Sequence, residues 1–140
     1  MNIQDFPYLQ TVASGVLAFG LGIFWYHPKI MGKRWMEARG KSMEDISPKP
    51  FPFVVSFVLW MLASCFYSFL IIIMGLDSTP ALICLSCLLW VAFAMPPTVM
   101  GAFFTGYPFN AVAIDSAYQL AGYYLFAITH ITIAQMGFGG

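Results

Sequence analysis

Four long apolar segments constrain the fold of this chain more than any other feature. They run over about residues 8–26, 53–76, 80–103 and 110–136. A hydrocarbon layer about 30 Å thick is crossed by roughly 20 helical residues, and each segment is long enough. The last three are separated by short joints, which make neighbouring helices antiparallel. We therefore predict an all-α, polytopic membrane protein with four transmembrane helices in a single domain over residues 1–140.

Composition excludes a soluble fold of this size. Hydrophobic residues make up 60% of the 140 residues and charged residues 9%. A soluble domain this small has too high a surface-to-volume ratio to bury so much apolar surface, whereas a bilayer can accommodate it.

The positive charge is confined to one loop, which predicts the orientation in the membrane. All six Lys and Arg residues lie between Lys29 and Lys49. Because loops rich in Lys and Arg stay in the cytoplasm, we expect loop 27–50 to be cytoplasmic. With four spans, both termini then lie outside a cell (inner) membrane.

Within this loop, the spacing from Lys29 to Arg39 predicts a short amphipathic helix lying in the membrane interface, with its lysines toward anionic headgroups. The expected interface anchors are Trp25, Tyr26, Lys29, Lys33, Arg34 and Trp35. Ser42 can cap a short turn through Asp45. The proline-rich stretch from Pro48 to Pro52 predicts an extended lead into the second span.

Small residues at four-residue spacing predict close helix packing, because they let backbones approach in lipid. The predicted packing seams are Ser14, Ala18 and Gly22 in the first segment and Ala113, Ala117 and Ala121 in the fourth. Such seams can lie within one bundle or between protomers.

Asp115 is the one carboxylate inside a predicted span, where a charge costs about 2.5–3.5 kcal/mol at the centre and less near the end. It can serve as an ion or proton site together with Gln119, beside a helix interrupted at Pro96-Pro97. Alternatively, it forms a salt bridge or a hydrogen bond to the juxtamembrane loop, with Lys33 or Arg34 as candidate partners.

His130 is a second polar group within a predicted span. It lies 15 positions after Asp115, about 22 Å along a helix, so the two do not form a dyad in one protomer. It can form an interhelical hydrogen bond or act as a ligand or proton-relay group. The Cys84–Cys87 pair has no second Cys or His cluster beside it, which indicates free apolar thiols rather than a metal site.

No catalytic motif, phosphate-binding loop or zinc spacing is present in the sequence. We expect neither a cofactor nor a metal, and the short basic loop does not indicate nucleic-acid binding. An enzyme is disfavoured, although one that acts on lipid at the basic interface is a third alternative.

One stretch carries a resemblance to a known family. Trp25, Tyr26, Pro28, Gly32 and Trp35 match a W-Y-x-P-x-x-x-G-x-x-W signature after the first helix. The chain resembles in this respect a bacterial family of membrane proteins of unknown function, with about this length and four predicted spans. The resemblance implies the architecture and assigns no substrate or catalytic residue.

The leading functional hypothesis is an integral membrane protein without catalytic machinery. It would assemble as a homo-oligomer or as a small subunit of a membrane complex, with the lipid bilayer and other membrane subunits as partners. The alternative is an oligomeric transporter or channel for a small solute, an ion or protons, which uses Asp115 and the Pro96-Pro97 break. Four helices are too few to enclose much of a pore, so this alternative requires oligomerisation.

Overall fold

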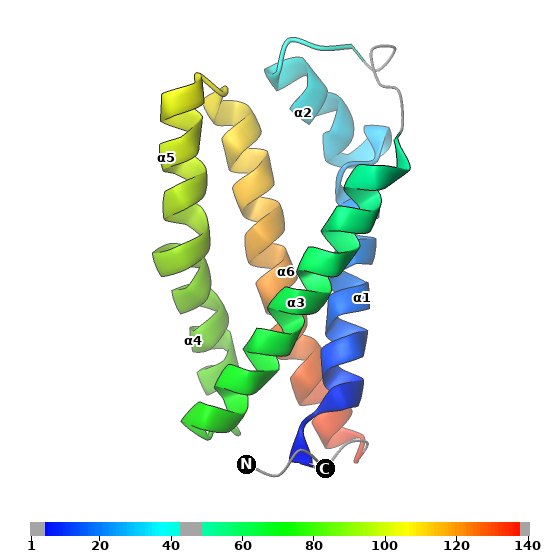
Figure 1. Cartoon of the computed structure of the whole chain (residues 1–140), viewed down its shortest axis with the longest axis vertical. Helices are drawn as coiled ribbons and strands as arrows, with labels where there is room; N and C mark the ends of the chain where they lie inside the picture. Colours follow the sequence, from blue (N-terminus) through cyan, green and yellow to red (C-terminus); the bar gives the residue numbers. More distant parts are fainter. Residues whose placement is uncertain (1–4, 43–48, 138–140) are drawn as a thin grey trace.

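The computed structural model describes residues 5–42 and 49–137, which are helical and contain no strand. Four long helical rods run along the long axis of the molecule (Figure 1). They are α1 (Tyr8–Trp25), α3 (Pro50–Met74), a composite rod of α4 (Thr79–Leu89), η4 (Trp90–Ala94) and α5 (Met95–Thr105), and α6 (Phe109–Gln135). The π-helical turn η2 (Pro28–Gly32) and α2 (Lys33–Ala38) follow α1.

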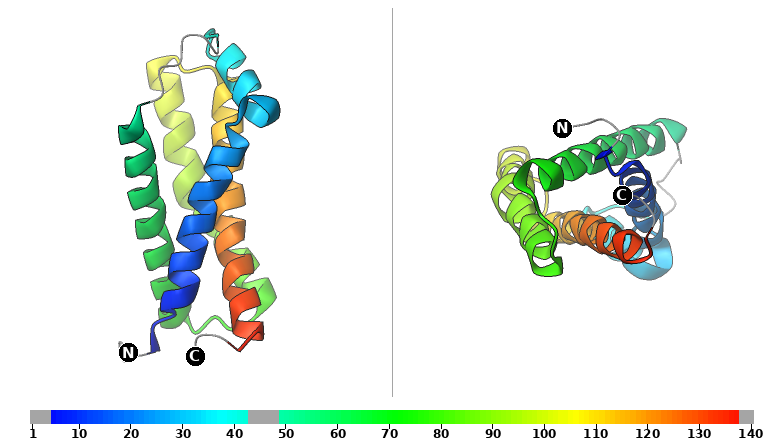
Figure 2. Two further views of the ribbon diagram at one scale, coloured as in Figure 1. Left: turned by 90° about the vertical axis from the view of Figure 1, so that its right-hand side faces the viewer. Right: turned by 90° about the horizontal axis from the view of Figure 1, so that it is seen from below.

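The rods alternate in direction, so each end of the bundle collects separate parts of the chain. The start of α1 and the end of α6 lie at one end, which we call the terminal end (Figures 1 and 2). Elements η2 and α2 and the joint between α5 and α6 lie at the other, which we call the basic end. Consecutive rods are antiparallel because the joints between α3 and α4 and between α5 and α6 are short.

Three helices in the described part of the chain are long and apolar enough to cross a membrane: Tyr8–Trp25, Pro50–Met74 and Thr79–Thr105. Helix α6 has 27 residues, which is long enough, but its Asn, Asp, Gln, Tyr and His side chains make it less apolar than the other three.

The expected extended lead into the second span is found at Lys49 but not beyond it. Lys49 is extended, whereas α3 already begins at Pro50 and includes Pro52. The backbone N–H groups in the first turn of a helix have no partner within that helix. Proline, which lacks this N–H, is therefore tolerated there, and its restricted φ favours the start of a helix. Pro48 lies outside the described residues.

The expected interruption at Pro96-Pro97 takes the form of a change in helix type, and the rod itself continues through both prolines. A π-helical segment, Trp90–Ala94, comes just before them, and the Met95 N–H bonds to the Trp90 carbonyl five residues back. The Thr98 hydroxyl donates to the Ala94 carbonyl at 2.8 Å. The wide turn and this hydroxyl together compensate for part of the hydrogen bonding that the prolines remove.

The predicted amphipathic helix over Lys29–Arg39 forms in two pieces. Residues Pro28–Gly32 make one wide π-helical turn, and only Lys33–Ala38 is α-helical. Gly40 ends the segment with a φ of 69°, a left-handed conformation that favours glycine. The turn expected after Ser42 lies outside the described residues.

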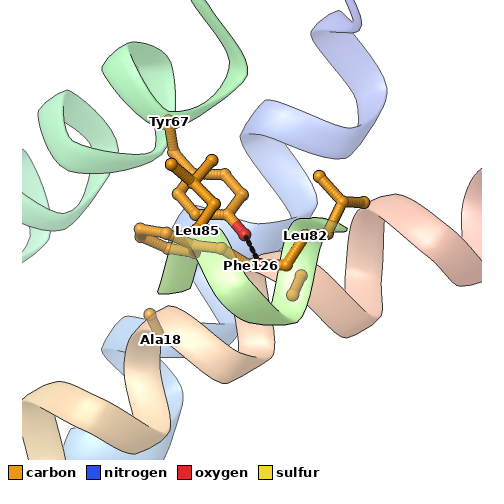
Figure 3. Close-up of a cluster of buried hydrophobic side chains, with 6 residues drawn as sticks. Ala18, Tyr67, Leu82, Leu85 and Phe126 are labelled. Atoms are coloured by element: carbon orange, nitrogen blue, oxygen red, sulfur yellow. Dashed lines mark hydrogen bonds between the residues drawn. The ribbon is translucent and has the colours of Figure 1, made fainter. Parts of the chain in front are cut away.

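The core lies where α3, α4 and α6 meet, toward the terminal end (Figure 3). Tyr67 and Phe126 are its largest buried side chains, with Leu82 and Leu85 packed around them. The Tyr67 hydroxyl donates to the Leu82 carbonyl at 3.0 Å. Without a hydrophobic driving force between helices in lipid, such packing and hydrogen bonding stabilise the bundle.

Helix α3 crosses the bundle diagonally in Figure 1 and approaches α4 at the terminal end. It packs against α1 in its second half, where Ser64 faces Gly15 and Ser68 contacts Thr11. Residues 50–59 are all exposed, so the first half of α3 contributes little to the core. Helices α3 and α5 diverge toward the basic end (Figure 1).

Candidate functional site

Asp115 is held by two tyrosine hydroxyl groups near the basic end. Helix α6 places its half-buried carboxylate beside the end of α1 and the joint before α6. Tyr26 donates to Oδ1 at 2.5 Å, and Tyr107 donates to Oδ2 at 3.0 Å. Hydrogen bonds to a charged group contribute about 1.5–3 kcal/mol each. Two of them are enough to offset the cost of a charge at this depth.

The expectation that Lys33 or Arg34 neutralises Asp115 is wrong. Lys33 instead lies 3.9 Å from Glu37, and both side chains are largely exposed. Arg34 is exposed. All six Lys and Arg residues fall in the described ranges, and none of them forms an ion pair with Asp115.

Arg39 lies next to Trp35 and Tyr107, two aromatic residues beside Asp115. Its guanidinium lies 4.3 Å from the centre of the Trp35 ring and 5.8 Å from that of Tyr107. The Trp35 indole donates to the Tyr107 hydroxyl at 3.1 Å. Partial burial and the neighbouring Asp115 carboxylate raise the pKa of Tyr107 above its ordinary value. Tyr107 therefore stays a neutral hydrogen-bond donor at physiological pH.

The W-Y-x-P-x-x-x-G-x-x-W residues build the contact between the basic end and α6. The Trp25 indole donates to the Ile114 carbonyl at 3.2 Å, and Trp35 bonds Tyr107 as described. The Tyr26 and Trp35 rings meet edge to face, with centroids 5.2 Å apart. The three aromatic residues predicted as interface anchors therefore have partners inside the protein.

Pro28 and Gly32 shape the turn that brings these aromatic residues together. Pro28 opens η2, and His27 before it accepts a hydrogen bond from the Lys29 backbone N–H through Nδ1. A Cβ at Gly32 would lie 2.9 Å from the carbonyl carbons of Tyr26 and His27, and closer still to the Tyr26 oxygen. Only glycine fits this approach without moving the backbone.

A polar groove runs beside Asp115, between α3 and the composite rod, with α6 as its floor. Its volume is about 510 Å³. Gln119 also lines it, and its amide nitrogen lies 3.5 Å from the Thr98 hydroxyl. We call this cavity the polar groove; its lining residues are Tyr26, Ser56, Leu59, Trp60, Ala63, Ala94, Thr98, Asp115, Tyr118, Gln119 and Tyr123.

The structure thus brings together Asp115, Gln119 and the region of Pro96 and Pro97. Ala94, two positions before Pro96, and Thr98, directly after Pro97, line the polar groove, whereas the prolines themselves do not. The Trp90 indole donates to the Ser116 carbonyl at 2.8 Å and ties the π-helical segment to α6.

His130 lies apart from this site, toward the terminal end. Its Nε2 is 2.8 Å from the Ser68 hydroxyl of α3, and its Nδ1 is 2.8 Å from the Phe126 carbonyl. Ser68 also contacts the Thr11 hydroxyl of α1 at 2.5 Å. His130 therefore takes part in a buried network that joins three helices.

The two predicted packing seams lie on different sides of the protomer. Ser14 and Ala18 are fully buried in α1, and Gly22 packs against the Tyr118 hydroxyl. That hydroxyl donates to the Ala18 carbonyl at 2.9 Å. The α6 stripe faces outward instead, with Ala113 and Ala117 exposed and Ala121 half-buried.

Sequence reasoning assigns Tyr107, Tyr118 and Trp60 no role in the site around Asp115. Tyr107 sits in the joint before α6, and Trp60 and Tyr118 are aromatic residues in apolar segments, so nothing in their local pattern distinguishes them. Their roles arise from contacts between helices that are distant in sequence.

No three His, Cys, Asp or Glu residues of the described ranges gather in a way that could hold a metal ion. The cysteines are free, with Cys84 exposed and the Cys87 sulfur 2.9 Å from the Tyr124 hydroxyl.

Comparison with known proteins identifies a family and no function. No curated protein and no solved structure matches the chain. A family model described as "Protein of unknown function" matches residues 9–131. This range covers α3 and the composite rod in full, nearly all of α1 and most of α6, and it includes the site around Asp115. The chain therefore belongs to this uncharacterised family, DUF1761.

Proposed function

We propose that the protein is a four-span integral membrane protein of the cell inner membrane, with α6 as the fourth span. A helix of 27 residues is about 40 Å long, which exceeds the hydrocarbon thickness. Its polar side chains meet partners on α1, α3 and the composite rod, as the bonds of Tyr118 and His130 illustrate. A less apolar helix sheltered by three apolar ones is compatible with a lipid environment.

The basic end is the cytoplasmic side in this proposal, and both termini lie outside. The orientation rests on the restriction of all six Lys and Arg residues to positions 29–49. Lys29, Lys33 and Arg34 are exposed at that end, where they can contact anionic headgroups while η2 and α2 lie in the interface. Cysteine accessibility tests the orientation: a cysteine replacing Lys33 should react with an impermeant thiol reagent only after the cytoplasmic side is opened.

The function that the geometry supports best is self-assembly without catalysis, either as a homo-oligomer or as a small subunit of a membrane complex. The exposure of Ala113 and Ala117 on α6 carries this proposal. Small residues on an outward face let a second helix approach closely. The corresponding small-residue stripe of α1 is packed inside the protomer, where Ser14 and Ala18 are fully buried. Of the two predicted stripes, the one on α6 is therefore the one that a partner could contact.

The mass of the protein in nanodiscs tests assembly. We expect a dimer or larger species for the natural chain and a shift toward monomer for Ala117→Leu. Ala134→Leu, an exposed position near the end of the same helix, is the matched control and should assemble normally. Ala18→Leu does not test assembly, because Ala18 is fully buried within the protomer. A strictly monomeric natural chain would refute the proposal.

A second candidate function is passage of a small solute, ion or proton through an oligomer. The polar groove favours it, because a groove with a carboxylate and an amide on its wall is costly to leave open to hydrocarbon. A second protomer or water would have to cover it. Proteoliposome flux that Asp115→Asn abolishes is the expected result, and no flux for common ions, protons and small solutes would refute this candidate.

A further inference from the structure

Asp115 brings a negative charge to the wall of the polar groove. No Lys or Arg of the described ranges forms an ion pair with it, and the Arg39 guanidinium instead lies over the Trp35 and Tyr107 rings. The hydrogen-bond partners of Asp115, Tyr26 and Tyr107, are neutral hydroxyls. They solvate the carboxylate without neutralising it. Each carboxylate oxygen accepts one of these bonds, so each keeps a second acceptor site. The ion pair found within residues 5–42 and 49–137 is Lys33–Glu37, which lies elsewhere.

The rest of the groove wall adds electron-rich surfaces and no positive charge. Trp60, Tyr118 and Tyr123 line it together with Tyr26. The Trp60 ring meets Tyr118 with centroids 5.5 Å apart and Tyr123 with centroids 6.2 Å apart, both edge to face. The faces of such rings attract cations, and tryptophan attracts them most strongly.

Gln119 supplies a further acceptor. Its side-chain oxygen is buried and has no hydrogen-bond partner among the residues that the structure describes. None of the lining residues is Lys, Arg or His. A carboxylate, an amide oxygen and four aromatic rings around one cavity are complementary to a cation that also has apolar surface.

Size and access narrow the class of ligand. A volume of about 510 Å³ falls within the roughly 300–1,000 Å³ of small-molecule pockets. A bare divalent cation does not fit the site, because it needs about six oxygen ligands and no cluster of three His, Cys, Asp or Glu residues is found in the described ranges. The lining residues come mainly from α3, from the composite rod and from α6. Because α3 and α5 diverge toward the basic end (Figure 1), a ligand would enter between these two rods.

We propose that the polar groove binds a lipophilic organic cation, with its charge at Asp115 and its apolar body against Trp60 and the tyrosine rings. An amine, a quaternary ammonium or a phosphonium with aromatic or alkyl groups has this chemistry. The inference deepens the second candidate function by naming its substrate class. Binding itself needs neither transport nor self-assembly, so it can be tested separately from both.

Tetraphenylphosphonium is the probe, with the full-length protein in nanodiscs. Equilibrium dialysis of the labelled cation, corrected with empty nanodiscs, should show saturable binding of one cation per protomer. Asp115→Asn should weaken this binding at least tenfold. Asp77→Asn is the matched control, because Asp77 is an exposed carboxylate in the joint between α3 and α4, and it should bind as the natural chain does.

Tetraphenylborate gives a comparison that needs no variant, since it has nearly the same size and the opposite charge. Labelled tetraphenylborate, dialysed on its own because the two ions would pair with each other in one solution, should show no saturable binding. The proposal is overturned if binding of the cation is not saturable, if Asp115→Asn binds equally well while folded, or if tetraphenylborate alone binds as tightly as the cation. Ala117→Leu should retain binding, so a failure of self-assembly leaves this result unaffected. Binding without flux would refute the second candidate function, passage through an oligomer, and would leave the binding proposal intact.

Discussion

Replacing Gly32 by alanine should release the contact between the basic end and α6. The new Cβ would lie 2.9 Å from two backbone carbonyl carbons, at least 0.5 Å inside the 3.4 Å at which ordinary contacts begin. Backbone atoms cannot rotate away as a side chain can, so η2 must shift. Trp35 follows three residues later and would move with it, away from the Tyr107 hydroxyl.

The magnitude follows from three contributions to the free energy of unfolding. Overpacking of this kind costs about 1–3 kcal/mol, and a lost neutral hydrogen bond costs about 0.5–1.5 kcal/mol. The better helix propensity of alanine returns about 1 kcal/mol. We therefore expect Gly32→Ala to lower the free energy of unfolding by about 0.5–3.5 kcal/mol.

Reversible unfolding in mixed micelles, followed by tryptophan fluorescence, measures this change. Gly20→Ala is the matched control, because Gly20 lies in α1 with no atom within 4 Å of its added Cβ. It should leave the stability unchanged or raise it slightly. A double-mutant cycle with Trp35→Phe should show that the two changes are not additive. If Gly32→Ala is as stable as the natural chain, or if Gly20→Ala loses as much, the steric argument is refuted.

Three further predictions concern single side chains. Tyr26→Phe should cost about 1.5–3 kcal/mol of stability, because it removes one hydroxyl from the Asp115 carboxylate; unchanged denaturant midpoints would contradict this. A double-mutant cycle of His130→Leu with Ser68→Ala should give a coupling energy of about 0.5–1.7 kcal/mol, and zero coupling would mean that the bond contributes nothing. Tyr107 has a raised folded pKa, so its contribution to stability is complete below the unfolded pKa of about 10 and is lost as pH rises through the folded value. As the pH is raised above about 10, the free energy of unfolding should therefore fall less for Tyr107→Phe than for the natural chain. Identical dependence on pH in the two proteins would argue against a raised pKa of Tyr107.

The contrast between Asp115 and its partners shows how far sequence reasoning reaches. A carboxylate inside an apolar segment is conspicuous in the sequence, so Asp115 and the neighbouring Gln119 could be singled out. Tyr26, however, lies 89 positions earlier, and no local pattern connects the two. Opposite charge makes Lys33 and Arg34 the partners of Asp115 that a sequence suggests. The hydroxyl groups that hold Asp115 belong instead to tyrosines, which in the sequence are indistinguishable from ordinary interface aromatics.

The prolines show the same limit on a smaller scale. Sequence rules predicted an interruption at Pro96-Pro97 and an extended lead through Pro52. Both segments are helical, because an N-terminal turn needs no proline N–H and a π-helical turn accommodates the pair. Which of several compensations a proline receives depends on its place in a helix and on neighbours such as Thr98.

The sequence by itself determined the helical class and the approximate bounds of the four rods, because apolar length and turn residues act locally along the chain. The tertiary structure decided how each helix is rotated about its axis. That rotation buries the small-residue stripe of α1 and exposes the stripe of α6, although the two patterns look alike in the sequence. It also gathers Tyr26, Tyr107 and Trp60 around the polar groove, since the side chains that meet depend on where the helices cross.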